Sequence, residues 1–203
     1  MDANALFKIS YGLFVLSAND GKKDNACIIN TLQQVSSDPL MVTVAVNKSN
    51  YTHDIIDKTG LFTASVISEA ANFELFKRFG FQSGKSVDKF ENFPHYLRAV
   101  NKTLAVTEGT CAYISAEVVK KLDLGSHTLF AAKVEEAKIL SDTPPATYDY
   151  YHANIKPKVE TKKETGKTIW RCKICGYEYE GEDLPDDFVC PICKHGKIDF
   201  EKV

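Results

Sequence analysis

Short apolar runs alternate with turn-forming residues over most of the chain, from about Leu6 to Leu140. Runs rich in β-branched and aromatic residues are typical of strands, and they lie at residues 13–16, 27–31, 40–46, 61–67, 110–115 and 128–134. Asn19-Asp20-Gly21 predicts a hairpin turn between the first two runs, and Gly125-Ser126 a turn between the last two. The pattern therefore predicts a mainly β domain of short antiparallel strands.

Two short helices are predicted between these strands. Residues 51–58 follow Ser49 and Asn50, which can cap a helix, and are closed by Gly60. Residues 69–78 follow Ser68 and are closed by Gly80. Both helices are expected to be insertions between strands, so the mainly β character is kept.

The pattern changes beyond about residue 153. Residues 156–167 contain five lysines, two glutamates and no aromatic side chain, so they cannot bury enough apolar surface to order themselves. We predict three parts: a domain at residues 1–153, a flexible linker at 154–168 and a small module at 169–203. A flexible stretch of about a dozen residues spans on the order of 20 Å and would let the module swing.

Length and charge exclude several classes of function. With 203 residues and 44% hydrophobic side chains, the chain can form one medium domain and one small one. A net charge of −2 and no basic cluster argue against nucleic-acid binding. Without an apolar run near the roughly 18 residues of a membrane span, and with an acidic start, we expect a cytoplasmic protein without membrane contact.

Four of the six cysteines form two Cys-x-x-Cys pairs in the last module: Cys172, Cys175, Cys190 and Cys193. Two such pairs present four sulfurs to one tetrahedral ion, and this ligand set suits iron and zinc alike. The small core beside the metal is expected from the aromatic residues Trp170, Tyr177, Tyr179, Phe188 and Phe200. The other two cysteines, Cys27 and Cys111, are predicted to be ordinary buried thiols.

Three polar stretches of the larger domain can form a site. They are the run Asn30-Thr-Leu-Gln-Gln-Val-Ser-Ser-Asp-Pro39, the strand–helix junction Asn47-Lys-Ser-Asn-Tyr-Thr52, and the basic loop from Phe76 to Lys85. Free N–H groups at a helix start favour phosphate, although a plain cap with a solvated lysine is the simpler alternative. No glycine-rich dinucleotide fingerprint is found in the sequence. The remaining histidines, His53, His95, His152 and His195, are expected to be surface or helix residues.

The last module resembles rubredoxin over essentially all of residues 169–203. The resemblance rests on Cys-x-x-Cys-Gly-Tyr177, on Leu184-Pro-Asp-Asp-Phe-Val-Cys-Pro-Ile-Cys193, and on Phe200-Glu-Lys. The loop between the pairs is shorter than usual, and Phe188 stands where a tryptophan is commoner. The resemblance implies one iron bound by four cysteines, which accepts one electron at a time.

The larger domain resembles the flavin reductase family with the FMN-binding split β-barrel fold, over about residues 5–150. The first two polar stretches carry this resemblance, together with Leu61-Phe-Thr-Ala-Ser-Val-Ile-Ser-Glu69, Phe79-Gly-Phe-Gln-Ser-Gly-Lys85, Asp88-Lys-Phe90 and Gly125-Ser-His-Thr128. It implies FMN as cofactor, with Asn30, Thr31 and Gln33 along the isoalloxazine. Lys48, Ser49, Tyr51 and Thr52 would form the phosphate site, with help from Arg78 or Lys85.

His127 is the candidate catalytic residue, because it falls where the family often has Gly-Asp-His near the nicotinamide. Ser126 replaces the acidic residue here, and a turn histidine bonded to the backbone is the alternative. Members of the family usually form homodimers with the flavin at the interface, so a homodimer is expected.

The two halves together resemble the flavin reductase–rubredoxin fusions called high-molecular-weight rubredoxins. The resemblance implies an oxidoreductase that moves electrons from NADH or NADPH through FMN to the iron. It further implies a redox partner protein such as a flavodiiron protein that reduces oxygen or nitric oxide. Two alternatives stay open: a pure electron carrier reduced by a separate reductase, and a binding module with zinc in the tail.

Overall fold

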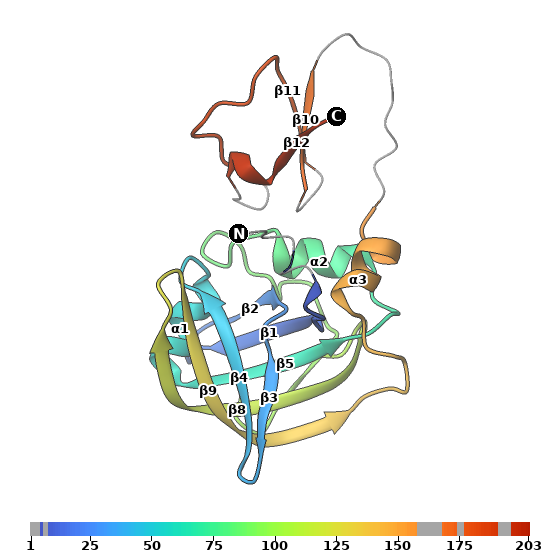
Figure 1. The fold of residues 1–203 in the computed structure, drawn as a ribbon. Coiled ribbons are helices and arrows are strands. Elements are labelled where there is room, and N and C mark those ends of the chain that lie inside the picture. Colours follow the sequence, from blue (N-terminus) through green and yellow to red (C-terminus); the bar gives the residue numbers. More distant parts are fainter. Residues whose placement is uncertain (1–4, 6–7, 158–167, 174–176, 191–195) are drawn as a thin grey trace.

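The computed structural model describes residues 5, 8–157, 168–173, 177–190 and 196–203. Its main feature is one antiparallel sheet with the strand order β2-β1-β5-β8-β9-β4-β3 (Figure 1). The strands are β1 (Phe14–Asn19), β2 (Asp24–Ile29), β3 (Gln33–Ser37), β4 (Leu40–Asn47), β5 (Leu61–Ile67), β8 (Thr110–Asp123) and β9 (His127–Ile139). A separate pair, β6 (Tyr96–Arg98) and β7 (Leu104–Val106), lies in the connection before β8. The predicted mainly β character is confirmed.

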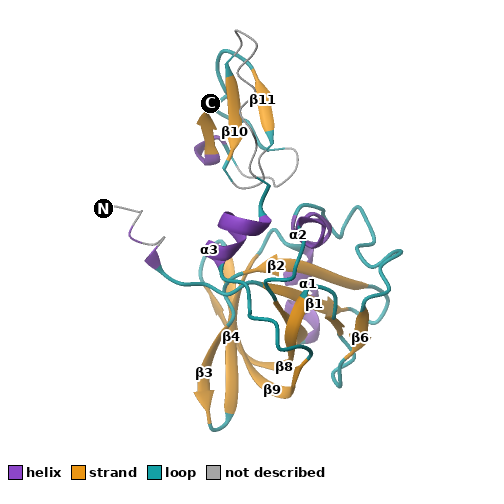
Figure 2. Ribbon diagram, turned by 90° about the vertical axis from the view of Figure 1, so that its right-hand side faces the viewer, coloured by secondary structure: helices purple, strands orange, loops and turns teal. Residues whose placement is uncertain are grey.

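Helices occupy the connections between strands. They are α1 (Tyr51–Thr59), α2 (Phe73–Gly80), the short α3 (Tyr148–Tyr150) and a π-helical turn that follows it (Tyr151–Ile155). Helix α1 ends as predicted at Gly60, whose backbone lies in the left-handed region with φ = 72°. Both views place α3 beside α2 (Figures 1 and 2), and the rings of Phe76 and Tyr151 pack with their centroids 4.4 Å apart.

Helix α2 begins later than the sequence predicted. The expected start at Glu69 is wrong because the N–H groups of Ser68 and Glu69 donate to the carbonyl oxygens of Gly109 and Pro144. The side chain of Asn72 instead caps the helix by accepting from the N–H of Leu75. Tertiary hydrogen bonds of the preceding loop thus decide the start of this helix.

The strands are also longer and more numerous than expected. β8 and β9 contain 14 and 13 residues and continue well past the predicted runs, since their outer halves are paired but exposed. The polar run after β2 contains the unpredicted strand β3, which forms a hairpin with β4 at the edge of the sheet (Figures 1 and 2). An exposed edge strand tolerates polar side chains on both faces, so it cannot be recognised from a pattern of apolar residues.

Strand β1 is buried on both faces, which places two cores on opposite sides of it. Leu16 belongs to a cluster with Val44, Ile56 of α1 and Phe62. Its neighbour Val15 points the other way, into a cluster that contains residues of α2. Apolar side chains therefore hold α1 and α2 against opposite sides of the same strand.

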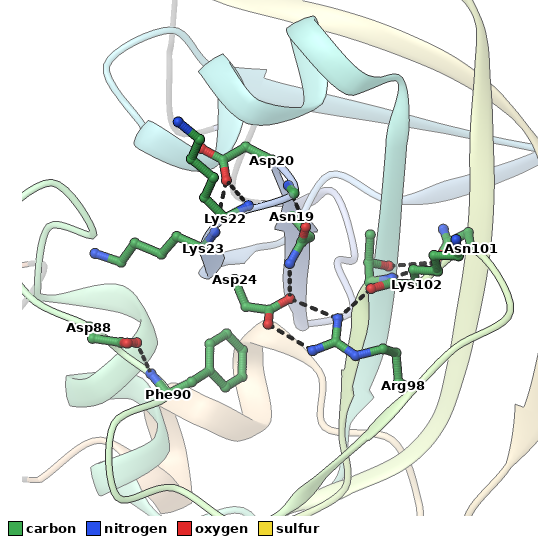
Figure 3. A network of polar contacts seen from close by, with 12 residues as sticks. Asn19, Asp20, Lys22, Lys23, Asp24, Asp88, Phe90, Arg98, Asn101 and Lys102 are labelled. Carbon is green, nitrogen blue, oxygen red and sulfur yellow. Dashed lines mark hydrogen bonds and ion pairs between the residues drawn. The ribbon is translucent and has the colours of Figure 1, made fainter.

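The predicted β1–β2 hairpin is confirmed. Gly21, with φ = 90°, donates its N–H to Asn19 Oδ1, and the N–H groups of Lys22 and Lys23 donate to Asp20 Oδ1. These backbone donors hold the pKa of the Asp20 carboxyl below its usual range. At the start of β2, Asp24 accepts from both terminal nitrogens of Arg98 (Figure 3). The hairpin is thereby tied to β6.

The last module has its own small antiparallel sheet, in the order β11-β10-β12. Its strands are β10 (Ile169–Cys172), β11 (Glu178–Glu180) and β12 (Phe200–Lys202), and a short 3₁₀ helix (Lys197–Asp199) precedes β12. The predicted aromatic core is confirmed: Phe188 packs 4.8 Å from the Tyr179 ring and 5.3 Å from the Phe200 ring, centroid to centroid. Trp170 and Tyr177 pack against the same cluster.

Most of the predicted linker, residues 158–167, lies outside the described residues. Its first two residues, Asn154 and Ile155, belong to the π-helical turn. Among the described helices, none is long and apolar enough to span a membrane.

Candidate functional site

A cavity of about 340 Å³ lies between the start of α1 and the loop that follows α2. Strand β2 contributes Asn25 and Cys27, and the start of α1 contributes Ser49, Asn50, Tyr51 and Thr52. The end of α2 and the loop after it complete the lining with Gly80, Phe81, Gln82, Ser83, Gly84, Ser86 and Lys89. The lining is thus largely polar and comes from three segments that are far apart in the sequence.

The start of α1 contributes backbone N–H groups to this cavity. Asn50 occupies the N-cap position with extended backbone, but its side chain makes no capping hydrogen bond. Asn47 Oδ1 instead accepts from the N–H of Ser49 at 2.9 Å, one residue before the cap. First-turn N–H groups without a side-chain cap, together with the helix dipole, favour an anion such as phosphate.

Asn25 supplies a second unsatisfied group on the cavity wall. Its side chain is buried, and its Nδ2 donates to Thr52 Oγ1 at 2.8 Å. Its Oδ1 has no partner in the described part of the chain. A Cβ added at Gly84 would lie 1.9 Å from this oxygen, so only glycine allows the loop to come so close. A buried acceptor without a partner is uncommon, and here Gly84 covers it at the edge of the cavity.

Of the residues predicted to bind phosphate, three lie together in the structure, and the lysines and the arginine have other partners. Ser49, Tyr51 and Thr52 line the cavity. Lys48 Nζ lies 2.7 and 2.8 Å from the two carboxylate oxygens of Asp123, and Lys85 Nζ lies 3.3 Å from Asp54. Both lysines therefore have carboxylate partners within the protein.

Arg78 faces a different region. Its guanidinium donates to the carbonyl oxygens of Lys89 and Glu91 and lies 5.2 Å from the centroid of the Phe93 ring. It lines a second cavity of about 220 Å³, which also contains His95 and Glu108. In this structure Arg78 therefore does not join Ser49 and Thr52.

The residues predicted along the isoalloxazine lie at the end of β2 and the start of β3. Thr31 Oγ1 donates to the carbonyl oxygen of Ala45 in β4 at 2.6 Å. Asn30 is partly buried, whereas Gln33 is exposed and its amide makes only a long contact of 3.5 Å with the Gln34 carbonyl. None of the three lines the cavity at α1, so their predicted role stays a prediction.

His127 begins β9 and pairs in register with Asn47 at the end of β4. Its Nδ1 lies 2.8 Å from Ser126 Oγ. It is therefore close in the fold to the strand–helix junction that forms the cavity, while its ring is engaged by the neighbouring turn residue. His53, expected to be a surface or helix residue, is buried in α1 with its Nε2 2.8 Å from Thr128 Oγ1.

Sequence reasoning did not assign Asn25, Cys27 or Lys89, which line the cavity, to a site. Cys27 is a buried thiol as predicted, and burial raises its pKa. Lys89 is buried as well, and burial lowers its pKa to about 8. A signal for Lys89 was present in the sequence, because a single lysine stands there close to the apolar Val87 and Phe90.

In the last module, Cys172 and Cys190 are fully buried in one small core. The N–H of Cys172 donates to the carbonyl oxygen of Tyr177 at 2.8 Å. Cys175 and Cys193, the other two predicted ligands, lie outside the described residues. Two buried sulfurs in a single core fit thiolate ligation of a metal ion.

Comparisons with known proteins agree with both halves of this arrangement. Residues 6–157 match the flavin reductase like domain, and residues 170–201 match the rubrerythrin, rubredoxin-like domain. High molecular weight rubredoxin of Moorella thermoacetica is 33% identical over 230 aligned positions, which cover all of both chains. A ferric-chelate reductase (NAD(P)H) of Archaeoglobus fulgidus is 35% identical over 78% of this chain and 93% of its own.

Among solved structures, the fold is similar to the NADH:FAD oxidoreductase SgcE6 of Streptomyces globisporus C-1027. The TM-score is 0.64 at 19% identity, over 71% of this chain and 84% of the other. The two domain matches imply a flavin, an iron and oxidoreductase activity. The chain therefore belongs to the flavin reductase-like family and combines this domain with a rubredoxin-like domain, as high molecular weight rubredoxin does.

Proposed function

We propose that this chain takes electrons from NADH or NADPH through FMN to an iron bound by Cys172, Cys175, Cys190 and Cys193. From the iron they pass to a redox partner protein, such as a flavodiiron protein that reduces oxygen or nitric oxide. The single observation that carries this proposal is the presence of both redox domains in one polypeptide.

The cofactors explain why the two domains are useful together. A nicotinamide donor delivers two electrons as a hydride, an iron with four thiolate ligands accepts one, and a flavin supplies chemistry that connects the two. The residues of the chain provide binding sites and orientation. The predicted linker at residues 154–168 would let the module reach both its own flavin and an outside acceptor.

The cavity at α1 supports FMN as the flavin. The uncapped helix start and the hydroxyls of Ser49 and Thr52 offer one anion site, which suits the single phosphate of FMN. Beside them the side chain of Asn25 lines the same cavity and adds a polar group to its wall. Because only Ser49, Tyr51 and Thr52 of the predicted residues meet there, these three are the ones we assign to the phosphate end.

A homodimer belongs to the same proposal. Exposed apolar side chains stand at the outer end of β8 and in the turn beyond it: Val119 is 53%, Leu122 57% and Leu124 51% exposed. Apolar residues exposed in this way are what a subunit interface covers. Sedimentation equilibrium of the full chain should give twice the monomer mass of 22.6 kDa, and a monomer mass would contradict the dimer.

Anaerobic addition of NADH and of NADPH to the purified chain tests the proposed activity. We expect at least one of them to bleach the visible flavin bands. If neither does so, although the flavin is present and chemically reducible, the chain is an electron carrier that depends on a separate reductase. Stoichiometric zinc and no organic chromophore in native material would contradict the whole proposal.

A further inference from the structure

Lys89 is a buried cation on the wall of the cavity at α1. The residue is only 4% exposed. Its Nζ donates to the carbonyl oxygens of Ala26 in β2 at 2.8 Å and of Phe79 in α2 at 2.9 Å. These two hydrogen bonds fix the ammonium group between a strand and a helix, and the Lys89 side chain itself lines the cavity.

No carboxylate neutralises this charge within the described part of the chain. The groups that act on it are Cys27, a thiol whose pKa is raised by burial, and Lys23, a like charge. Lys23 Nζ donates in turn to the carbonyl oxygens of Gly84 and Val87. Two neutral carbonyl oxygens offset only part of the desolvation free energy of a buried ammonium group. Without a counter-charge, the buried cation therefore destabilises the folded state.

The same cavity contains the uncapped start of α1. Lys89 therefore shares its cavity with first-turn N–H groups and with the hydroxyls of Ser49 and Thr52. An ammonium group has three N–H donors, and the described residues provide acceptors for two. A dianion placed at the helix start would accept a hydrogen bond from the third N–H donor and would supply the missing counter-charge.

We propose that Lys89 is the buried cation that binds the phosphate group of the flavin, so that the bound phosphate completes a charge pair. The proposal rests on the proposed function and adds to it the residue that distinguishes a phosphorylated flavin from riboflavin. It also differs from the assignment of the exposed Lys48 and Lys85, which already have carboxylate partners.

The test compares Lys89→Gln with the wild-type full chain after removal of flavin. Glutamine lacks the charge but keeps two N–H donors for the Ala26 and Phe79 carbonyls. Affinities for FMN and for riboflavin are measured by quenching of flavin fluorescence. We expect FMN binding to weaken at least tenfold and riboflavin binding to stay within twofold. Lys22→Met, which removes an exposed cation of the β1–β2 turn, should change neither affinity.

Unchanged FMN affinity in a Lys89→Gln protein that still binds riboflavin would overturn the assignment. If the wild-type chain binds neither flavin, the proposed function is contradicted instead. The failure of the Lys89 assignment and the failure of the proposed function are therefore distinguishable.

If Lys89→Gln does not fold, the wild-type chain provides the test through its pH dependence between pH 7 and 9. The charged and titratable groups around Lys89 are Cys27 and Lys23, Arg78, which donates to the Lys89 carbonyl, and the neighbouring Asp88. The pKa of Lys89 is about 8, while burial keeps the Cys27 thiol neutral over this range. FMN affinity should fall above pH 8 relative to riboflavin affinity, and a constant ratio would contradict the proposal.

Discussion

A single buried lysine links the stability of the flavin-free protein to pH. Burial lowers the pKa of Lys89 from 10.5 to about 8. Between these values the unfolded chain keeps the proton that the folded chain has released, so unfolding takes up a proton and stability rises with pH. Between pH 8 and 10.5 the free energy of unfolding of the flavin-free wild type should rise by up to about 3 kcal/mol relative to that of Lys89→Gln. Urea denaturation of both proteins at several pH values measures this difference, and parallel pH curves would contradict it.

The hydrogen bond between Asn25 and Thr52 leads to a second prediction. Thr52→Val removes the oxygen that accepts from Asn25 Nδ2 and leaves a buried amide without a partner. We expect FMN affinity to fall by about 1 to 3 kcal/mol. The matched control is Thr59→Val in the same helix, whose hydroxyl donates to the Ile55 carbonyl away from the cavity. Equal FMN affinities of the two variants, measured by fluorescence titration, would remove Thr52 from the site.

At this scale, residues of the cavity wall can be predicted from the sequence when the signal is local. Ser49 and Thr52 were predicted because they flank a helix start, and that geometry depends only on neighbours in the chain. Asn25 and Lys89 were missed because they reach the cavity through pairing and packing over tens of residues. Lys48 shows the converse: it looks free in the sequence, but the β8–β9 turn brings Asp123 within 2.7 Å of it.

Among the elements, the loop after α2 sets the size of the cavity. Gly84 lies so close to Asn25 that an added Cβ would stand 1.9 Å from its side-chain oxygen. Gly84→Ala must therefore displace the loop or break the Asn25–Thr52 bond, and we expect FMN affinity to fall at least tenfold. Val87→Ala, an exposed change in the same loop, is the control. FMN titration of both proteins checks this, and equal affinities would show that the loop does not border the flavin.

Elements with apolar periodicity were predicted, whereas those specified by tertiary contacts were not. Strand β5 was found with its observed bounds, Leu61–Ile67, because β-branched and aromatic residues fill it. The polar edge strand β3 and the outer halves of β8 and β9 carry no such pattern. The delayed start of α2 depends on carbonyl oxygens of Gly109 and Pro144, which the local sequence does not contain.

For the whole molecule, two redox modules in one chain should be separable by a single substitution. Cys190→Ser removes a fully buried sulfur from the core of the last module. We expect the ferric thiolate absorbance to disappear, while bleaching of the flavin by pyridine nucleotide persists. Visible spectra of the variant before and after anaerobic NADH or NADPH check this. Loss of both signals would show that the modules depend on each other.

The central claim is that paired electrons become single ones within this polypeptide, and an anaerobic reductive titration tests it most directly. The wild-type chain is titrated with whichever of NADH and NADPH bleaches the flavin, while the flavin and ferric bands are followed together. The expected result is uptake of about three electrons per chain, two by flavin and one by iron. Flavin bleaching that leaves the ferric band unchanged would contradict the claim.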